Sequence, residues 1–583
     1  MTVVDQVPAN HLASLAERAW ETVIAGQPML ATAYGDHRFD DRIDDLSPAA
    51  GAAVRAGLTA LRDEAEALPA DSLPAADRIT RSALLGFVDS EIADHDRRYA
   101  GWPIDPLNAP QVALPHLAAV HQAADPAQGR VMVTRWRALG PHVDQYAANV
   151  TAALADGLVA PAVLVRKAVG QLDRMLAEPV EKWALTAPAH QERPGWPAAE
   201  RSRFAADLTA AVADGLAPAL RRLREVLATE VLPAARPDDR VGISELPGGA
   251  AGYQRALRGF LSRDVAPADL HQLGLAELDR IDAELTELGG RLFGARNLAG
   301  VLRRLRSDPA LRFADRDEVL ATAIASTARA ESALDGWFGL RPPGPCEVTA
   351  MLPHEEATSP AAKYYPPAPD GSRPGRYYVN LSLPEQRPRY DAEALAFHEA
   401  VPGHHQQIAV AQQLGELPTF RRFGMVTVYV EGWGLYAERL ADEMGLYSGD
   451  LDRLGILSFD SWRACRLVVD TGLHALGWSR QQAIDLLATH SAVSLRDIAV
   501  EVDRYIGWPG QATAYKFGQL ELLRLRAEAR RRAGDRYDVR AFHDAVLGSG
   551  ALPLTALQEV VEQAFPGPGA VAGERAGGPP GAG

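Results

Sequence analysis

Hydrophobic residues recur at helical spacing through most of the chain. In most windows the apolar positions fall three or four residues apart, which is the period of an amphipathic helix. Residues 10–240 match long helices interrupted at prolines. Residues 267–289 form the clearest case, because Pro267 suits a first turn and the Gly289-Gly290 pair is typical of a helix end. The pattern predicts a mainly α-helical protein.

The pattern changes near residue 341, where prolines and β-prone residues replace the helical period. Residues 376–381, with the sequence RYYVNL, predict a strand, and the preceding DGSRPG is turn chemistry. We expect a small antiparallel sheet, with helices resuming at Asp391 as an N-cap. Tyr378 and Asn380 share one face of the strand. An edge strand there could pair with extended substrate, and a packed sheet is the alternative.

These changes divide the chain into four regions. We predict an N-terminal helical region at 1–240, a helical connecting region at 241–340, a region carrying the chemistry at 341–565 and a disordered tail at 566–583. The tail is rich in Gly, Ala and Pro, a composition that cannot bury enough apolar surface to fold.

Composition and charge exclude several classes of protein. The net charge is −15, and the Arg-rich segment 524–536 is interleaved with Leu, Ala and Glu, so no nucleic-acid partner is expected. Two cysteines exclude a multi-disulfide scaffold and a four-cysteine zinc site. No apolar run is long enough to span a membrane. The first twenty residues lack the apolar run of a secretory signal, so a cytoplasmic location is expected.

The segment HEAVPGHH at residues 398–405 carries the candidate chemistry. Many zinc hydrolases place two His four residues apart on a helix, with Glu after the first. Here Pro402 stands where the second His would be, and it would clash with the carbonyl of His398. We expect a helix break at Pro402-Gly403 that lets His404 or His405 turn towards His398. A polar helix surface or a satisfied buried network is the alternative.

A second segment, VEGWGLYAE at residues 430–438, lies in a mostly apolar helix. A buried Glu is costly unless it is paired or binds a metal, so Glu431 is the candidate third ligand. Gly432 and Gly434 leave room for a close approach. Glu438, two turns further along, either supports a ligand or forms an ordinary salt bridge.

The two segments together resemble the bacterial domain of unknown function 885 family. That family is regarded as related to gluzincin metallopeptidases such as carboxypeptidase Taq and angiotensin-converting enzyme. The resemblance implies a large helical gluzincin-like fold with a deep cleft between helical halves. It also implies zinc on His398, His404 and Glu431, with Glu399 as general base, and it favours His404 over His405. Further similar stretches are 373–381, 466–478 and 509–526, and more weakly 31–41.

Other candidates follow from the need to stabilise an oxyanion and to hold a substrate. Tyr515 could donate to the oxyanion, with an ordinary core tyrosine as the alternative. Arg466 could hold a substrate carboxylate, or pair with Asp470 one turn away. Asp470 or His474 could instead orient a ligand His. The remaining substrate-binding candidates are His405 and Lys516, together with Tyr378 and Asn380.

The sequence therefore predicts a metal-dependent hydrolase of a peptide or small-molecule amide bond. Zinc is the expected metal, because two His and one Glu suit it, and manganese or iron(II) could use the same ligands. One alternative is a pathway-specific metalloenzyme that acts on a non-peptide biosynthetic intermediate. Another is a catalytically inactive helical binding protein. The substrate, endo- or exo-cleavage and the oligomeric state stay open.

Overall fold

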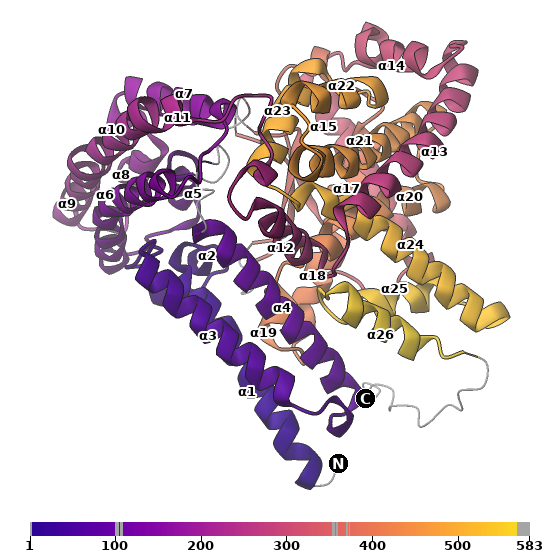
Figure 1. Ribbon diagram of the computed structural model, residues 1–583, viewed down its shortest axis with the longest axis horizontal. Coiled ribbons are helices and arrows are strands. Elements are labelled where there is room, and N and C mark those ends of the chain that lie inside the picture. Colours follow the sequence, from indigo (N-terminus) through magenta and orange to yellow (C-terminus); the bar gives the residue numbers. More distant parts are fainter. Residues whose placement is uncertain are drawn as a thin grey trace.

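The computed structural model describes residues 3–99, 104, 109–352, 356, 359–368, 371 and 373–567, and the chain is mainly helical (Figure 1). The predicted helical class is confirmed. Most of the predicted tail, residues 568–583, lies outside the described residues. None of the described helices is long and apolar enough to cross a membrane.

The first half of the chain consists of helices that form the indigo-to-magenta side of Figure 1. Its α-helices are α1 Val3–Gly26, α2 Pro28–Ala33, α3 Pro48–Ala67, α4 Ala75–Tyr99, α5 Pro110–Val120, α6 Pro126–Ala155, α7 Ala162–Ala177, α8 Ala187–His190, α9 Ala198–Ala210, α10 Ala217–Val226 and α11 Leu232–Ala234.

The second half holds further helices and the sheet. Its α-helices are α12 Gly249–Leu261, α13 Pro267–Phe293, α14 Leu298–Ser307, α15 Arg316–Ala333, α17 Ala392–Glu399, α18 His404–Gln413, α19 Thr419–Phe423, α20 Thr427–Glu443, α21 Asp450–Ala475, α22 Arg480–His490, α23 Leu495–Gly507, α24 Ala514–Ala533, α25 Val539–Leu547 and α26 Leu554–Ala564.

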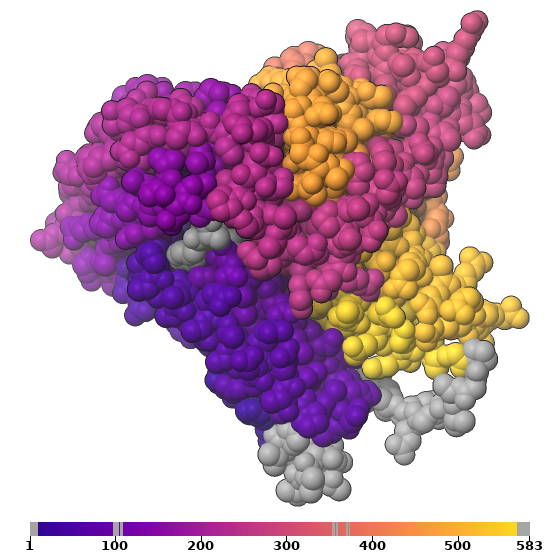
Figure 2. Space-filling view, in the orientation of Figure 1, coloured from indigo at the N-terminus to yellow at the C-terminus, as the bar shows by residue number. Residues whose placement is uncertain are grey.

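Two large apolar cores each join helices from both halves of the chain. One core contains Trp136 of α6 together with Val468 of α21. The other contains Leu84 of α4 together with Leu557 of α26. In the space-filling view the surfaces of the two halves meet directly (Figure 2). Burial of apolar surface thus holds distant parts of the sequence against one another.

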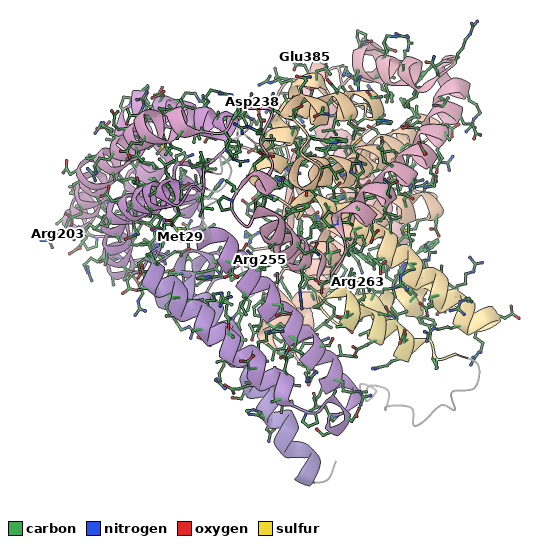
Figure 3. The ribbon with its side chains drawn as sticks, viewed as in Figure 1. Met29, Arg203, Asp238, Arg255, Arg263 and Glu385 are labelled. Atoms are coloured by element: carbon green, nitrogen blue, oxygen red, sulfur yellow. The ribbon has the colours of Figure 1, made fainter. Side chains whose placement is uncertain are left out.

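Polar contacts also cross this junction. The carboxylate of Asp238, labelled in Figure 3, accepts from Arg166 at 3.0 Å, and its backbone carbonyl accepts from the backbone N–H of Arg480 at 2.9 Å. Asp503 of α23 pairs with Lys167 of α7 at 2.6 Å. These bonds connect α7 to the helices around α21.

The small sheet is mixed, so the prediction of an antiparallel sheet is wrong in part. Its strands are β1 Glu347–Ala350, β2 Ala362–Tyr365 and β3 Arg376–Val379, in the order β1-β3-β2. β1 is parallel to β3, and β2 is antiparallel to it. β3 is therefore the central strand, and β2 forms an edge.

The strand also ends two residues earlier than the predicted 381. The buried side-chain amide of Asn380 donates to the carbonyls of Glu356 at 2.8 Å and Ser359 at 3.1 Å. This side-chain bonding ties the end of the strand to the preceding loop.

Close helix packing places the segments that carry the candidate site. α13 packs along α21, and α20 packs along α24. A Cβ on Gly432 of α20 would lie 2.6 Å from the Cα of Gly518 of α24, so only glycine permits this approach. The contact brings Glu431 of α20 close to the first turn of α24.

Candidate metal centre

The helix break expected at Pro402-Gly403 is present. α17 ends at Glu399 and α18 begins at His404. Gly403 is required in the turn, because a Cβ there would lie 2.0 Å from the carbonyl oxygen of His398. The turn brings the ring of His404 to 4.6 Å from that of His398, centroid to centroid, at an interplanar angle of 82°. An unbroken helix would have separated them by about 9 Å along its axis.

Three side chains converge across this turn. Glu431 Oε2 lies 3.9 Å from His398 Nε2 and 3.8 Å from His404 Nε2. The three ligand atoms all lie within 4.8 Å of one another. Two atoms each bound to one zinc ion at about 2.1 Å are separated by at most about 4.2 Å, so a small contraction completes the set. Within the part of the chain that the structure describes, no other such group of His, Cys, Asp and Glu occurs.

Glu438 fixes the orientation of the first histidine. Its Oε1 accepts from His398 Nδ1 at 2.8 Å, which leaves Nε2 directed at Glu431. The ring fits because a Cβ on Gly434 would lie 2.6 Å from His398 Cε1. Glu438 was expected either to support a ligand or to form an ordinary salt bridge. The geometry favours support of a ligand, since the nearest described cation, Arg463, lies 3.9 Å away.

Both histidines are held as neutral imidazoles, the form that binds metals. Burial, and then the neighbouring His398, lower the pKa of His404 to about 4, against the opposing charge of Glu431. Burial also lowers the pKa of His398 well below its usual value. His404 Nδ1 is buried and has no hydrogen-bond partner among the described residues. At neutral pH both rings can therefore offer a lone pair.

The carboxyl group of Glu399 lies beside the cluster. Burial and then the charge of Glu431 raise its pKa to about 8, and a hydrogen bond from the backbone N–H of Tyr364 opposes the rise. A carboxyl group whose pKa lies near the working pH can accept and return a proton efficiently.

Tyr515, in the first turn of α24, also reaches the site. Its pKa is raised first by burial and then by the charge of Glu431. The guanidinium carbon of Arg466 lies 4.4 Å from its ring centroid. Tyr515 thus interacts electrostatically with a candidate ligand and packs against a buried cation.

Arg466 does not pair with Asp470, so that alternative is wrong. Its Nε donates to Tyr505 Oη at 2.9 Å and its Nη2 to Glu501 at 3.2 Å. Asp470 instead accepts from the hydroxyl of Tyr253 at 2.6 Å.

His474 is engaged elsewhere as well. Its Nδ1 accepts from the backbone N–H of Ile243 at 3.2 Å, and its Nε2 donates to the carbonyl of Tyr505 at 3.0 Å. Neither Asp470 nor His474 is bonded to a candidate ligand, and the suggestion that one of them orients a histidine is wrong.

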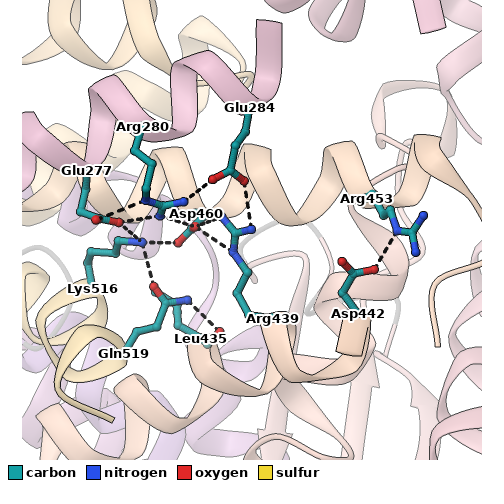
Figure 4. A network of polar contacts seen from close by, with 10 residues as sticks. All are labelled: Glu277, Arg280, Glu284, Leu435, Arg439, Asp442, Arg453, Asp460, Lys516 and Gln519. Atoms are coloured by element: carbon teal, nitrogen blue, oxygen red, sulfur yellow. Dashed lines mark hydrogen bonds and ion pairs between the residues drawn. The ribbon is translucent and has the colours of Figure 1, made fainter. Parts of the chain in front are cut away.

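Lys516 does not face the site, which corrects its assignment to substrate binding. Its buried ammonium donates to Asp460 at 2.6 Å and Gln519 at 2.8 Å and pairs with Glu277 at 2.9 Å (Figure 4). All three donors are used, because Lys516 turns into a separate buried ion network.

His405 is likewise occupied. Its Nδ1 interacts with Tyr364 Oη at 3.0 Å, and its Nε2 donates to the carbonyl of Gly344 at 2.9 Å. Both ring nitrogens are used inside the protein, so His405 offers none to a metal or a substrate. The choice between the two histidines falls on His404.

The expectation that Tyr378 and Asn380 lie on an edge strand is wrong. Tyr378 is in the central strand β3, where its ring packs edge-on against Tyr365 at 5.6 Å. The side-chain amide of Asn380 donates to backbone carbonyls. Both residues support the sheet, and the open edge belongs to β2.

Two residues that the sequence reasoning did not single out lie at the site. Tyr364 of β2 faces Glu399 through its backbone and His405 through its hydroxyl. Arg463 of α21 is 5% exposed, and its charge opposes the raised pKa of Glu438. The signal for Arg463 was available, because a second arginine one turn before Arg466 stands in an otherwise apolar stretch.

Together the fold and the site define a mainly helical protein with a candidate His-His-Glu metal centre. The chain belongs to the family described as bacterial protein of unknown function (DUF885), whose sequence model matches residues 28–561. The family predicted from the sequence motifs is therefore confirmed. A comparison with curated proteins gives no significant match.

Two solved structures share the fold. A candidate lipoprotein from Colwellia psychrerythraea is 27% identical with a TM-score of 0.87, and the match covers 95% of this chain and 99% of that one. A candidate lipoprotein of unknown function from Shewanella oneidensis is 19% identical with a TM-score of 0.73, and the match covers 94% and 99%.

Proposed function

We propose that the protein is a metal-dependent hydrolase of amide bonds, with zinc held by His398, His404 and Glu431. One observation carries the proposal: two neutral imidazoles and a carboxylate converge within 4.8 Å, beside a carboxyl group with a raised pKa. Two His and one Glu form a donor set typical of catalytic zinc, and manganese or iron(II) would fit the same ligands.

The residues around the cluster divide the chemistry among them. Zinc bound there would polarise the substrate carbonyl and make water more acidic. Glu399 accepts the proton of the attacking water and returns it to the leaving amine. Tyr515 donates from its hydroxyl to the oxyanion that forms on the carbonyl oxygen. Glu438 keeps His398 in the tautomer whose Nε2 faces the cluster.

An extended substrate has an open strand to pair with. The backbone N–H of Asn380 donates to Ala361 O at 3.0 Å, so alternate residues of β2 face β3. Ala362 and Tyr364 therefore direct their backbone groups to the free edge. The N–H of Tyr364 meets Glu399, which places this edge beside the proposed base. We infer that β2 holds a peptide-like substrate in a gluzincin-like cleft.

Metal analysis of purified protein tests the proposal. After zinc loading and gel filtration we expect about one metal ion per chain in the natural protein and less than about 0.1 in His398→Ala. His490→Ala is the matched control, since His490 pairs with Asp282 at 2.7 Å away from the cluster, and it should keep the metal. Less than about 0.1 metal in the natural protein, or an unchanged content in His398→Ala, overturns the assignment.

The cellular location remains a prediction. Cell fractionation tests the cytoplasmic location expected from the sequence. Recovery with the cell envelope would contradict it and would agree with the description of two similar structures as candidate lipoproteins.

A further inference from the structure

Arg466 keeps one nitrogen without a partner in a buried position. The residue is 4% exposed. Its Nε and Nη2 are bonded to Tyr505 and Glu501, whereas Nη1 is buried and has no hydrogen-bond partner among the described residues. A buried donor without an acceptor destabilises the folded state. The bonds of Nε and Nη2 fix the orientation of the guanidinium, and Nη1 can still donate a hydrogen bond.

This guanidinium lies against the proposed catalytic site. It stands between two aromatic rings, with its central carbon 4.5 Å from the centroid of Trp462 and 4.4 Å from that of Tyr515. The charge of Glu431 raises the pKa of Tyr515, and the charge of Arg466 lowers the pKa of His398. Both aromatic residues are partly exposed, so the cation is covered by side chains that border solvent.

The local charges leave a positive excess. Arg466 and Arg504 share the single carboxylate of Glu501, at 3.2 Å and 3.0 Å. Neither arginine has another carboxylate within 4 Å in the described part of the chain. Arg463, one turn before Arg466, also has a buried Nε and Nη1 without partners among the described residues, where the carboxylate oxygen nearest to it, on Glu438, is 3.9 Å away. An anion would balance the excess.

We propose that the site selects substrates that carry a free carboxylate near the scissile amide, with Arg466 Nη1 as its anchor. Peptides with a free C-terminus and N-acyl amino acids are the substrate class. This proposal rests on the hydrolase function proposed above. A site built to bond a carboxylate discriminates against the neutral amide, because the amide leaves the buried donor unpaired. Glu501 and Tyr505 hold the guanidinium in place before the substrate arrives.

Paired substrates test this selectivity. The probes are N-acetyl-phenylalanyl-phenylalanine and its C-terminal carboxamide, with kcat/KM measured for the zinc-loaded protein. We expect the acid to be preferred by at least about 100-fold, and the preference to fall below about 10-fold in Arg466→Gln. Arg453→Gln on the same helix, an exposed residue paired with Asp442, should keep the full preference. Equal rates on both probes, or a preference that survives in Arg466→Gln, would overturn the proposal.

A binding measurement separates this proposal from the hydrolase function. Calorimetry with N-acetyl-phenylalanine and its carboxamide needs no turnover. We expect the acid to bind at least about 10-fold more tightly than the amide, and Arg466→Gln to remove the difference. If neither probe is hydrolysed but the difference is present, the hydrolase proposal fails and the carboxylate site stands. Arg466→Lys keeps the charge and serves if Arg466→Gln does not fold, and it should retain only part of the difference.

Discussion

The metal cluster and the ion network of Figure 4 share helix α20, yet the pKa values of their buried carboxyl groups shift in opposite directions. Burial alone raises the pKa of Asp460 in the network, but Lys516 at 2.6 Å and Arg439 at 2.5 Å outweigh it and lower the pKa. At the cluster, burial raises the pKa of Glu399 and of Glu438 to about 8. Asp460 has cations within hydrogen-bond distance, whereas Arg463, the nearest described cation to Glu438, lies 3.9 Å away.

The difference separates structural polar groups from functional ones. All three N–H donors of Lys516 have acceptors within the network. The network therefore stabilises the packing of α13, α20, α21 and α24. At and beside the cluster, His404 Nδ1 and Arg466 Nη1 have no hydrogen-bond partner in the part of the chain that the structure describes. Tyr515 and Lys516 are neighbours in sequence but project from α24 about 100° apart, one towards each region. A divalent cation at the cluster would supply the charge that Lys516 supplies to the network.

Glu399→Gln should have the largest effect on function. The substitution keeps the shape of the side chain but removes the group that accepts the proton. We expect turnover of a peptide amide to fall by about 10²- to 10⁴-fold, with about one zinc ion per chain retained. Single-turnover rates with metal analysis of the same sample measure both quantities. A variant with natural turnover would remove Glu399 from the mechanism.

Lys516→Met should break the network without touching the cluster. It leaves Asp460 and Glu277 with fewer cations, and we expect the free energy of unfolding to fall by about 3 kcal/mol, since Arg439 still pairs with Asp460. Arg453→Met is the control: its pair with Asp442 is exposed, and a change below about 1 kcal/mol is expected. Denaturant unfolding measures both. Loss of zinc binding by folded Lys516→Met would show that the two regions are not separate.

The sequence predicted the features that depend on local chain chemistry. The long helix from Pro267 is present, although it runs to Phe293 and ends at Gly294, which has a φ of 67°, and not at Gly289-Gly290. Gly289 is needed for packing instead, since a Cβ there would lie 2.4 Å from Val301. The break between Glu399 and His404 was predictable because Pro and Gly act on their own backbone.

Features that depend on partners distant in sequence were not predictable. Lys516 was a substrate-binding candidate next to Tyr515 in the chain, but its partner Asp460 is 56 residues away. The edge of the sheet was assigned to residues 376–381 because strand propensity does not reveal which strands lie on either side. The sequence left open whether Glu438 supports a ligand or forms a salt bridge, and only the position of His398 in space favours support of a ligand.

Glu438→Gln sharpens the role of the carboxylate behind His398. The amide can still accept from His398 Nδ1, but it no longer carries the charge that makes the imidazole a stronger ligand. We expect the dissociation constant for zinc to rise by about 10- to 100-fold, measured by competition with a chelator. Glu443→Gln on the same helix is the matched control, because Glu443 pairs with Arg526 at 2.7 Å at the surface. An unchanged zinc affinity in Glu438→Gln would make that contact merely structural.

The pH dependence of stability should distinguish the two regions in the natural protein. The pKa values of Glu399 and Glu438 are about 8 in the metal-free folded state, against about 4.3 for an unfolded Glu. Between pH 6.5 and 8 the folded state therefore holds more protons, and its free energy of unfolding falls as the pH rises, by up to about 1.4 kcal/mol per pH unit for each group. The histidines, whose pKa values are lowered, act in the opposite direction, and their effect fades as the pH rises above about 6.5, the pKa of an unfolded His.

Zinc should remove much of this slope, because a neighbouring dication favours the ionised carboxylates. The increase in Tm that zinc produces should then be larger at pH 8 than at pH 6.5. Asp470, whose pKa burial raises to about 7, contributes equally with and without zinc and cancels in the difference. Asp460 has a lowered pKa and loses its stabilising effect only in acid, so the network adds nothing in this window. An equal increase in Tm at the two pH values would mean that zinc does not change the pKa values of Glu399 and Glu438. It would then contradict the proposed explanation of the difference between the two regions.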